Sequence, residues 1–302
     1  MKFGSLITFV VVCLHFARPV VADEPVGDHD AFQIAFGESD PIDWLSVVPN
    51  ARIGDDFEYV IRGQDEDKEG DLAAKSQNPI ADLASVPIQN NFDFNLGPDD
   101  RTRYIGNFQP VIPLKLNEDW NLIARAIVPF ENVPVGLDQR SDGIGNTTGQ
   151  FFFSPRTDSP FTWGVGPTIL FPTASEPFLG GPEWGTGVCA VALISEKPIV
   201  AGTLITQLFT TGGASQPFLL QPFFNYNLPK GWFLSAIAEV NADWQQDSKN
   251  RWAIVGGPGF GRVFPLFGQP LNVSCRFAPY FASPTGGPNW QFRLFVSMLF
   301  PK

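Results

Sequence analysis

Side chains alternate between an apolar and a more polar face over ten residues near the end of the sequence, from Gln291 to Phe300. One face consists of Phe292, Leu294, Val296, Met298 and Phe300, and the other of Gln291, Arg293, Phe295, Ser297 and Leu299. Because neighbouring side chains of a β-strand point to opposite faces, this pattern predicts a strand with one apolar face. Ten residues at about 3.3 Å each, tilted by about 45°, rise roughly 23 Å, close to the apolar band of an outer-membrane barrel. A soluble β-sandwich can end in the same way, so the distinction rests on the rest of the chain.

The first 22 residues have the composition of a secretory signal. Lys2 supplies a short charged region, an apolar run follows from Leu6 to Leu14, and Ala22 stands at the expected cleavage position. The apolar run is too short to span a bilayer as a helix. Cys13 raises the alternative of a lipoprotein, but the valines before it are not the small residues that a lipidation signal needs. We therefore expect residues 1–22 to be removed and the rest of the chain to be exported.

Acidic residues are concentrated directly after this signal. The chain carries a net charge of −11. Residues 23–82 contain 16 acidic and 4 basic residues, whereas residues 83–302 contain 15 and 14. We interpret residues 23–82 as a partly ordered acidic periplasmic extension, and the sequence leaves open whether part of it folds into a barrel as a plug. The excess of acidic residues argues against a nucleic-acid partner.

Twelve strand-like segments occupy residues 83–302. The chain has 29 Gly, 29 Phe, 28 Pro and 8 Trp with only 17% charged residues, which is typical of a turn-rich β protein. No segment after the signal is apolar for long enough to form a membrane helix. The predicted strands are 85–96, 102–116, 120–130, 149–154, 162–171, 185–194, 199–209, 218–228, 232–240, 251–260, 271–279 and 290–300. They predict an all-β fold, an antiparallel transmembrane β-barrel of about 12 strands.

The connections between the predicted strands alternate in length. Mostly short ones, such as Asn117–Asp119 and Pro229–Gly231 but including the ten-residue Gly261–Pro270, alternate with connections that are longer on average, such as Glu131–Thr148 and Pro172–Trp184. This alternation is expected of a membrane barrel with both termini in the periplasm. The polar strand faces contain mainly Asn, Gln, Ser and isolated Arg, whereas the solvent faces of a sandwich usually carry Lys, Glu and Thr. Aromatic residues near strand ends predict girdles at both membrane interfaces, namely Tyr104, Trp120, Trp163, Trp184, Tyr226, Trp232, Trp252 and Trp290.

Seven prolines within the predicted strands argue against a membrane barrel. Proline lacks the N–H that a strand ladder needs, and hydrocarbon cannot replace the missing hydrogen bond. They are Pro87, Pro110, Pro113, Pro167, Pro222, Pro258 and Pro279. These prolines must lie at bulges or strand ends if the strand assignments are correct. The run Phe151–Phe153 also interrupts the alternation, so the sequence does not predict which of its side chains face inward.

Several short motifs resemble one family of outer-membrane proteins. They are Ser76–Asp82, Ser85–Asn91, Gln109–Pro113, Glu118–Ile123, Phe151–Pro155 and Gly286–Trp290. Together they are similar to segments of the transporters grouped as the "MetA-pathway of phenol degradation" family, over about residues 75–302. The resemblance implies an outer-membrane barrel and a channel or transporter for small compounds, hydrophobic or aromatic ones among them. It supplies no catalytic motif, and Pro301 and Lys302 depart from the commonest ending of such barrels.

Histidine is absent from the predicted barrel, because the two histidines of the chain are His15 and His29. A Ser-His hydrolase needs a base within hydrogen-bond reach of its nucleophile, so we expect no enzymatic activity. We expect neither a metal nor a cofactor, since Cys189 and Cys275 alone do not make a zinc site. Packed free thiols are favoured over a disulfide between these two cysteines. The glycines within Gly256–Gly261 are interpreted as bulge or turn residues and not as a phosphate loop.

Charged and amide side chains on the inner faces are the candidate functional residues. A charged group on the lipid face would cost about 2 to 4 kcal/mol at mid-membrane, so these groups are expected to point into the lumen. The candidates are Asp93, Arg103, Gln109, Arg125, Gln221, Asn225, Glu239, Arg276 and Arg293. They can form ion pairs that fill a narrow barrel, with Asp93 and Glu239 neutralising arginines, or set the selectivity of an open lumen, and the sequence leaves both open.

Two functions of different classes are compatible with these observations. The first is a passive outer-membrane channel for small solutes. The second is a structural or interaction barrel without transport activity, whose acidic extension or outer loops bind a partner. Outer-membrane lipid and the barrel assembly machinery are the expected partners in either case, and no residue identifies the solute.

Overall fold

Antiparallel strands form the wall of a barrel in the structure, a computed structural model that describes residues 68–136 and 139–301. The predicted signal and most of the predicted extension therefore lie outside the described residues. The strands are β1 (Ala84–Leu96), β2 (Arg101–Phe108), β3 (Val111–Lys115), β4 (Trp120–Val135), β5 (Gln139–Ile144), β6 (Thr147–Pro155), β7 (Phe161–Phe171), β8 (Gly185–Glu196), β9 (Ile199–Thr210), β10 (Pro217–Asn227), β11 (Trp232–Asp243), β12 (Trp252–Leu266), β13 (Gln269–Ala282) and β14 (Trp290–Phe300).

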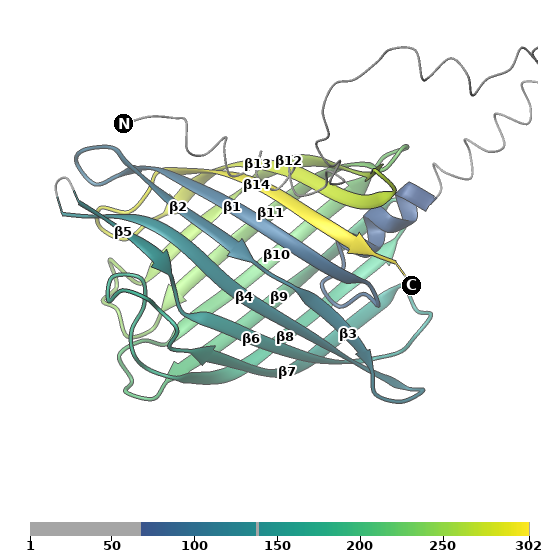
Figure 1. Cartoon of the computed structure of the whole chain (residues 1–302), viewed down its shortest axis with the longest axis horizontal. Helices are drawn as coiled ribbons and strands as arrows, with labels where there is room; N and C mark the ends of the chain where they lie inside the picture. Colours follow the sequence, from purple (N-terminus) through teal and green to yellow (C-terminus); the bar gives the residue numbers. More distant parts are fainter. Residues whose placement is uncertain (1–67, 137–138, 302) are drawn as a thin grey trace, which may run out of the picture. The chain divides into compact units, whose positions relative to one another are not determined.

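The sheet closes on itself because its last strand, β14, pairs with its first strand, β1 (Figure 1). The register places Val86 opposite Met298, so the last strand pairs with the strand predicted at 85–96. Strands β2 and β3 both pair with β1 and β4, and therefore occupy one position in the wall. Strand β5 pairs with the end of β4 and stands outside this circuit. Over the described residues the 14 strands make a closed barrel of 12 positions, which confirms the predicted fold class.

The two ends of the barrel differ in the length of their connections. At one end the strands are joined by turns of two to five residues, and at the other most of the loops are longer, up to 13 residues. We call these the short-turn end and the long-loop end. The helical residues 68–76 and the end of β14 lie at the short-turn end (Figure 1). The alternation of short and long connections predicted from the sequence is confirmed.

Two predicted boundaries were wrong because strands extend further than their apolar alternation. The predicted loop 131–148 contains the end of β4 and all of β5, which form a hairpin at the long-loop end (Figure 1). The predicted turn 261–270 is mostly strand, because β12 and β13 meet in a turn of only Phe267 and Gly268. Both residues have positive φ, at 51° and 81°, as a two-residue hairpin turn of the primed type requires. The many Gly and Pro residues of this segment resemble a loop in sequence, although they belong to a hairpin.

Each of the seven prolines predicted to oppose the barrel lies where a ladder is interrupted. Pro110 separates β2 from β3, so the strand predicted at 102–116 is broken there. Pro222 pairs with Thr203 of β9, whereas the ladder to β11 has no pair between Leu220 and Phe223. The other five prolines, Pro87, Pro113, Pro167, Pro258 and Pro279, likewise pair with a neighbouring strand on one side only. Each proline therefore lacks its N–H at a place where the ladder to one neighbouring strand is already interrupted, as the sequence argument required.

Buried side chains identify the inner face of the wall. On β14 the buried residues are Gln291, Arg293, Ser297 and Leu299, which agrees with the predicted alternation. In the run whose facing the sequence did not predict, Phe152 is completely buried and Phe153 is 40% exposed, so Phe152 points inward. Cys189 is buried and Cys275 is partly exposed, and both are free thiols as predicted.

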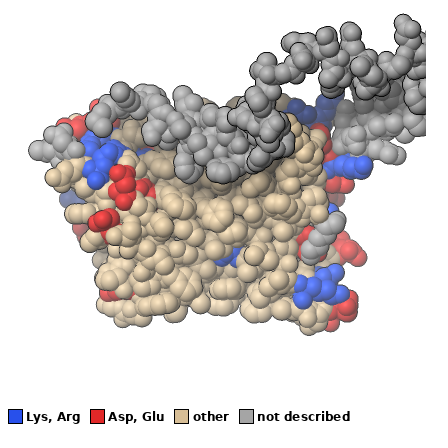
Figure 2. All heavy atoms as spheres, viewed as in Figure 1, with Lys and Arg blue, Asp and Glu red and all other residues tan. Residues whose placement is uncertain are grey.

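The outer face is apolar and carries aromatic residues at both ends. Trp120 and Trp163 contact each other edge-to-face at the short-turn end, with ring centroids 6.0 Å apart. Trp290 stacks on Phe94 at the long-loop end, with centroids 4.1 Å apart. Lys, Arg, Asp and Glu gather at the two ends of the visible face, and a broad band between them is nearly free of charge (Figure 2). On this face a band nearly free of charge separates the two ends, and an aromatic pair lies at each end of the barrel, as expected of interfacial girdles.

Residues 68–83 enter the lumen at the short-turn end. Ala73 and Leu83 pack in one apolar cluster with Phe233, Val263 and Leu299 of the inner wall. Ile80 is 4% exposed and belongs to a second cluster, which contains Ile123, Phe152, Cys189, Val191, Leu193, Val200 and Leu204. Part of the segment interpreted as an extension thus lies inside the barrel, a point that the sequence had left open. None of the helical residues in the described part of the chain forms a helix long and apolar enough to cross a membrane.

Candidate functional site

Asp93 is the centre of one polar cluster in the lumen. This β1 residue is 1% exposed, and its Oδ2 accepts hydrogen bonds from Nε and Nη2 of Arg103 at 3.0 and 2.8 Å. Its Oδ1 accepts from the Tyr280 hydroxyl at 3.0 Å and from the Gln291 amide at 2.9 Å. Both oxygens of a nearly inaccessible carboxylate are therefore satisfied, as a buried charge requires.

Glu239 of β11 holds a second cluster together. It forms a two-point ion pair with Arg293, in which Nη2 lies 2.9 Å from Oε2 and Nη1 contacts Oε1. Nη2 of Arg276 lies 3.4 Å from the same Oε1 and donates to Oε1 of Gln291 at 2.8 Å. The Gln221 amide lies 3.5 Å from Glu239. Since Gln291 also donates to Asp93, the two clusters form one network between β1 and β11.

Glycines of β12 give Arg276 the room to reach Glu239 across the intervening strand. A Cβ atom at Gly259 would lie 2.6 Å from the Cys275 carbonyl oxygen and 3.3 Å from Cβ of Arg276. The guanidinium passes over this strand, and its Nη1 donates to the Ile237 carbonyl of β11 at 3.1 Å. The glycine run therefore lies inside β12 and packs beside the network, whereas the sequence analysis interpreted these glycines as bulge or turn residues.

Arg125 of β4 lies on the opposite side of the lumen and forms no ion pair with a described residue. Its Nη2 donates to Oε1 of Gln109, which is 5% exposed. Among the described residues no Asp or Glu lies within ion-pair distance of Arg125. This guanidinium is therefore a partly buried cation whose neighbour is a neutral amide.

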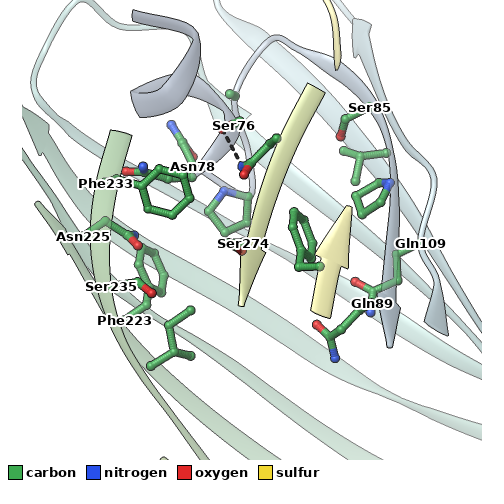
Figure 3. Close-up of a pocket in the computed structure, with 18 of the residues that line it drawn as sticks. Ser76, Asn78, Ser85, Gln89, Gln109, Phe223, Asn225, Phe233, Ser235 and Ser274 are labelled. Carbon is green, nitrogen blue, oxygen red and sulfur yellow. Dashed lines mark hydrogen bonds between the residues drawn. The ribbon is translucent and has the colours of Figure 1, made fainter. Parts of the chain in front are cut away.

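A cavity of about 200 Å³ lies between residues 68–83, which we call the N-terminal segment, and this network (Figure 3). Ser76 and Asn78 of the segment form one wall, and Ser235, Ser274 and Phe223 belong to the barrel wall around it. The arginines on its surface are Arg125, Arg276 and Arg293, together with Lys75 of the segment. No Asp or Glu is among the described residues that line the cavity. The cavity is therefore electropositive.

All nine residues predicted for the lumen face it. Asp93 pairs with Arg103, Glu239 pairs with Arg276 and Arg293, and the remaining ones lie on the cavity wall or in the network: Gln109, Arg125, Gln221 and Asn225. The sequence analysis did not single out Tyr280, because it assigned this residue to a loop. In the structure Tyr280 belongs to the end of β13. Gln291 was placed on the inner face but was not recognised as the residue that joins the two clusters.

The chemistry of these groups is that of binding and charge compensation. The described residues contain no group of three or more His, Cys, Asp and Glu placed to hold a metal ion. Arginine forks, amides and hydroxyls offer many donors, which suits an acceptor-rich solute.

Comparison with known proteins gives structural likeness without sequence likeness. No family model and no curated protein matches the sequence. The COG4313 outer membrane channel from Pseudomonas putida F1 superposes with a TM-score of 0.57 at 13% identity, over 72% of this chain and 94% of that chain. An OmpF structure from Salmonella typhi in complex with daunomycin covers 72% of this chain and 97% of its own, with a TM-score of 0.40 at 8% identity. This chain therefore has the barrel fold of the first of these proteins.

Proposed function

We propose that this protein is a passive channel of the bacterial outer membrane for small solutes. One observation carries the proposal: a barrel with an outer band nearly free of charge, and an aromatic pair at each end, encloses a cavity lined by three arginines. Charges inside and apolar groups outside are the distribution that a lipid environment favours. Donors that line a lumen set which solutes pass. The fold shared with the Pseudomonas putida channel supports the same assignment.

The topology of the proposal places both termini and the short turns in the periplasm and the long loops outside the cell. It includes export by cleavage of residues 1–22, contact with outer-membrane lipid, and insertion by the barrel assembly machinery. Membership of the phenol-degradation transporter family is also a proposal. It rests on motifs such as Ser85–Asn91, at the start of β1, and Gly286–Trp290, which leads into β14. That membership favours hydrophobic or aromatic solutes.

A closed barrel with a structural or binding role is the second candidate. Its support is the N-terminal segment, whose residues Ala73 and Ile80 are 0% and 4% exposed inside the lumen. A lumen filled at one end, with most of its charges paired, resembles a packed interior as much as a pore. This candidate and the channel differ in whether solutes cross the barrel.

Conductance of the mature protein in planar lipid bilayers tests the proposal. We expect discrete current steps after insertion of the full mature chain. Heat-modifiable migration on a denaturing gel serves as the control for folding, since a closed barrel migrates differently before and after boiling. Correctly folded protein that gives no steps over a wide voltage range contradicts the channel and supports the closed barrel.

A further inference from the structure

We propose that the lumen cavity is a binding site for a small aromatic carboxylate. The inference rests on the proposed channel and names the class of solute that its interior recognises. The first observation is charge: Arg125, Arg276, Arg293 and Lys75 line the cavity, and no Asp or Glu among the described residues does. Within the lumen the single carboxylate of Glu239 pairs with both Arg276 and Arg293, whereas Arg125 is hydrogen-bonded to the neutral Gln109 and has no carboxylate partner among the described residues.

An unsatisfied donor is the second observation. Arg276 is only 3% exposed, and its buried Nε has no hydrogen-bond partner. Buried polar atoms without a partner are rare, because they have given up hydration without compensation. Oδ1 of Asn272, on the same cavity wall, is likewise buried without a partner. Both atoms are closed off from the cavity, so a small shift of the side chains is needed before a carboxylate accepts from Nε of Arg276 and an ordered water donates to Oδ1 of Asn272.

Apolar side chains complete the walls and argue against a bare inorganic anion. Phe223, Phe233 and Phe295 line the cavity together with Val111 and Leu204. The volume of about 200 Å³ exceeds the roughly 150 Å³ of an engineered apolar cavity that binds benzene, so a single ring with one carboxylate fits. Rings favour aromatic neighbours, and a planar carboxylate matches the fork of an arginine. An uncharged phenol would use the rings but leave the arginines without an anion.

Isothermal titration calorimetry of the full mature protein in detergent tests this proposal with sodium benzoate as the probe. Benzamide has the same ring and shape without the charge, and acetate has the charge without the ring. We expect benzoate to bind about tenfold to hundredfold more tightly than either compound, the range expected for one charge-assisted hydrogen-bonded contact. Equal binding of benzoate and benzamide would overturn the anion site, and equal binding of benzoate and acetate would overturn the aromatic one.

Two variants locate the site. Arg125→Gln is expected to weaken benzoate binding about tenfold or more, whereas Arg251→Gln, in the loop between β11 and β12, is expected to leave it unchanged. Ser235→Phe keeps every arginine but fills the cavity with a ring, so we expect this variant to abolish benzoate binding. Each variant is first shown to be folded by heat-modifiable migration. Benzoate binding that survives in both folded cavity variants places the ligand elsewhere and refutes the proposal.

The failure of this inference is distinguishable from failure of the channel. Current steps without selective benzoate binding retain the channel and discard the ligand class. Selective benzoate binding without current steps retains the site in a barrel that does not conduct.

Discussion

At the scale of single residues, Glu239 determines whether two arginines can remain in the lumen. Its two oxygens accept from both Arg276 and Arg293, whose side chains are 4% and 8% exposed. Removing one partner of a buried ion pair leaves an uncompensated buried charge, which costs about 3 to 5 kcal/mol. We therefore expect Glu239→Gln to lower the free energy of unfolding by that amount, measured by urea unfolding in detergent micelles.

The matched control is the same substitution at an exposed pair. Glu118 contacts Lys115 in the turn between β3 and β4, and its side chain is 86% exposed. Glu118→Gln is expected to change the free energy of unfolding by less than about 0.5 kcal/mol, because exposed pairs are well solvated. Equal stability of the two variants would mean that the Glu239 pairs do not hold the lumen together.

The candidate residues of the lumen could be predicted from the sequence because facing follows from a period of two. Arg293 lies three positions after Trp290, the exposed first residue of β14, and this odd separation places it on the inner face. The partners could not be predicted, since Asp93 and Gln291 are 198 positions apart and meet only when β1 closes against β14. Pairing across a closure depends on strand register, which no local pattern contains.

At the scale of elements, close approach between β6 and β7 requires a residue without a side chain. A Cβ atom at Gly166 would lie 1.8 Å from the carbonyl oxygen of Phe151, a backbone atom that cannot turn away. Gly164, two residues earlier on β7, would bring its Cβ no closer than 3.3 Å to its neighbours. We expect Gly166→Ala to lower the free energy of unfolding by about 1 to 3 kcal/mol, as overpacking does.

Gly164→Ala is the control for this prediction, because it makes the same chemical change on the same strand but its new contacts, at 3.3 Å and beyond, are far less severe. Urea unfolding of the two variants in micelles is the measurement. If Gly164→Ala is as destabilising as Gly166→Ala, general loss of glycine and not the contact with Phe151 explains the effect.

The number of positions in the barrel wall could be predicted, but several strand ends could not. Alternation of apolar residues marks the part of each strand that forms the uncharged band, and β4 continues past it to Val135 with polar residues on both faces. The β12–β13 turn was missed because Pro265 and Pro270 face each other across the ladder, where proline usually indicates a loop. The strand ends outside the band are set by hairpin pairing, which the alternation does not report.

At the scale of the whole molecule, residues 68–83 separate two hollows of the short-turn end. Asn78 and Ala81 line both the central cavity and a second hollow of about 430 Å³ beside the turn between β6 and β7. A solute that crosses the barrel therefore has to pass this segment. Hydrogen bonds fix it to the wall, from the Asn272 amide to Ser76 Oγ at 3.0 Å and from the Gln77 amide to Asn227 at 2.8 Å.

A disulfide between Ser76→Cys and Asn272→Cys, formed at the site where the Asn272 amide now donates to Ser76 Oγ, would hold the segment in place. We expect the oxidised double variant to lose conductance in planar bilayers and to recover it when dithiothreitol reduces the bond, since passage requires the segment to move. Each single-cysteine variant, oxidised in the same way, should conduct like the parent protein and thereby excludes an effect of the substitutions alone or of the two native thiols. Formation of the bond is checked by mass spectrometry. An oxidised, cross-linked barrel that conducts like its reduced form would show that solutes pass beside a stationary segment, and the segment would then line the pore instead of closing it.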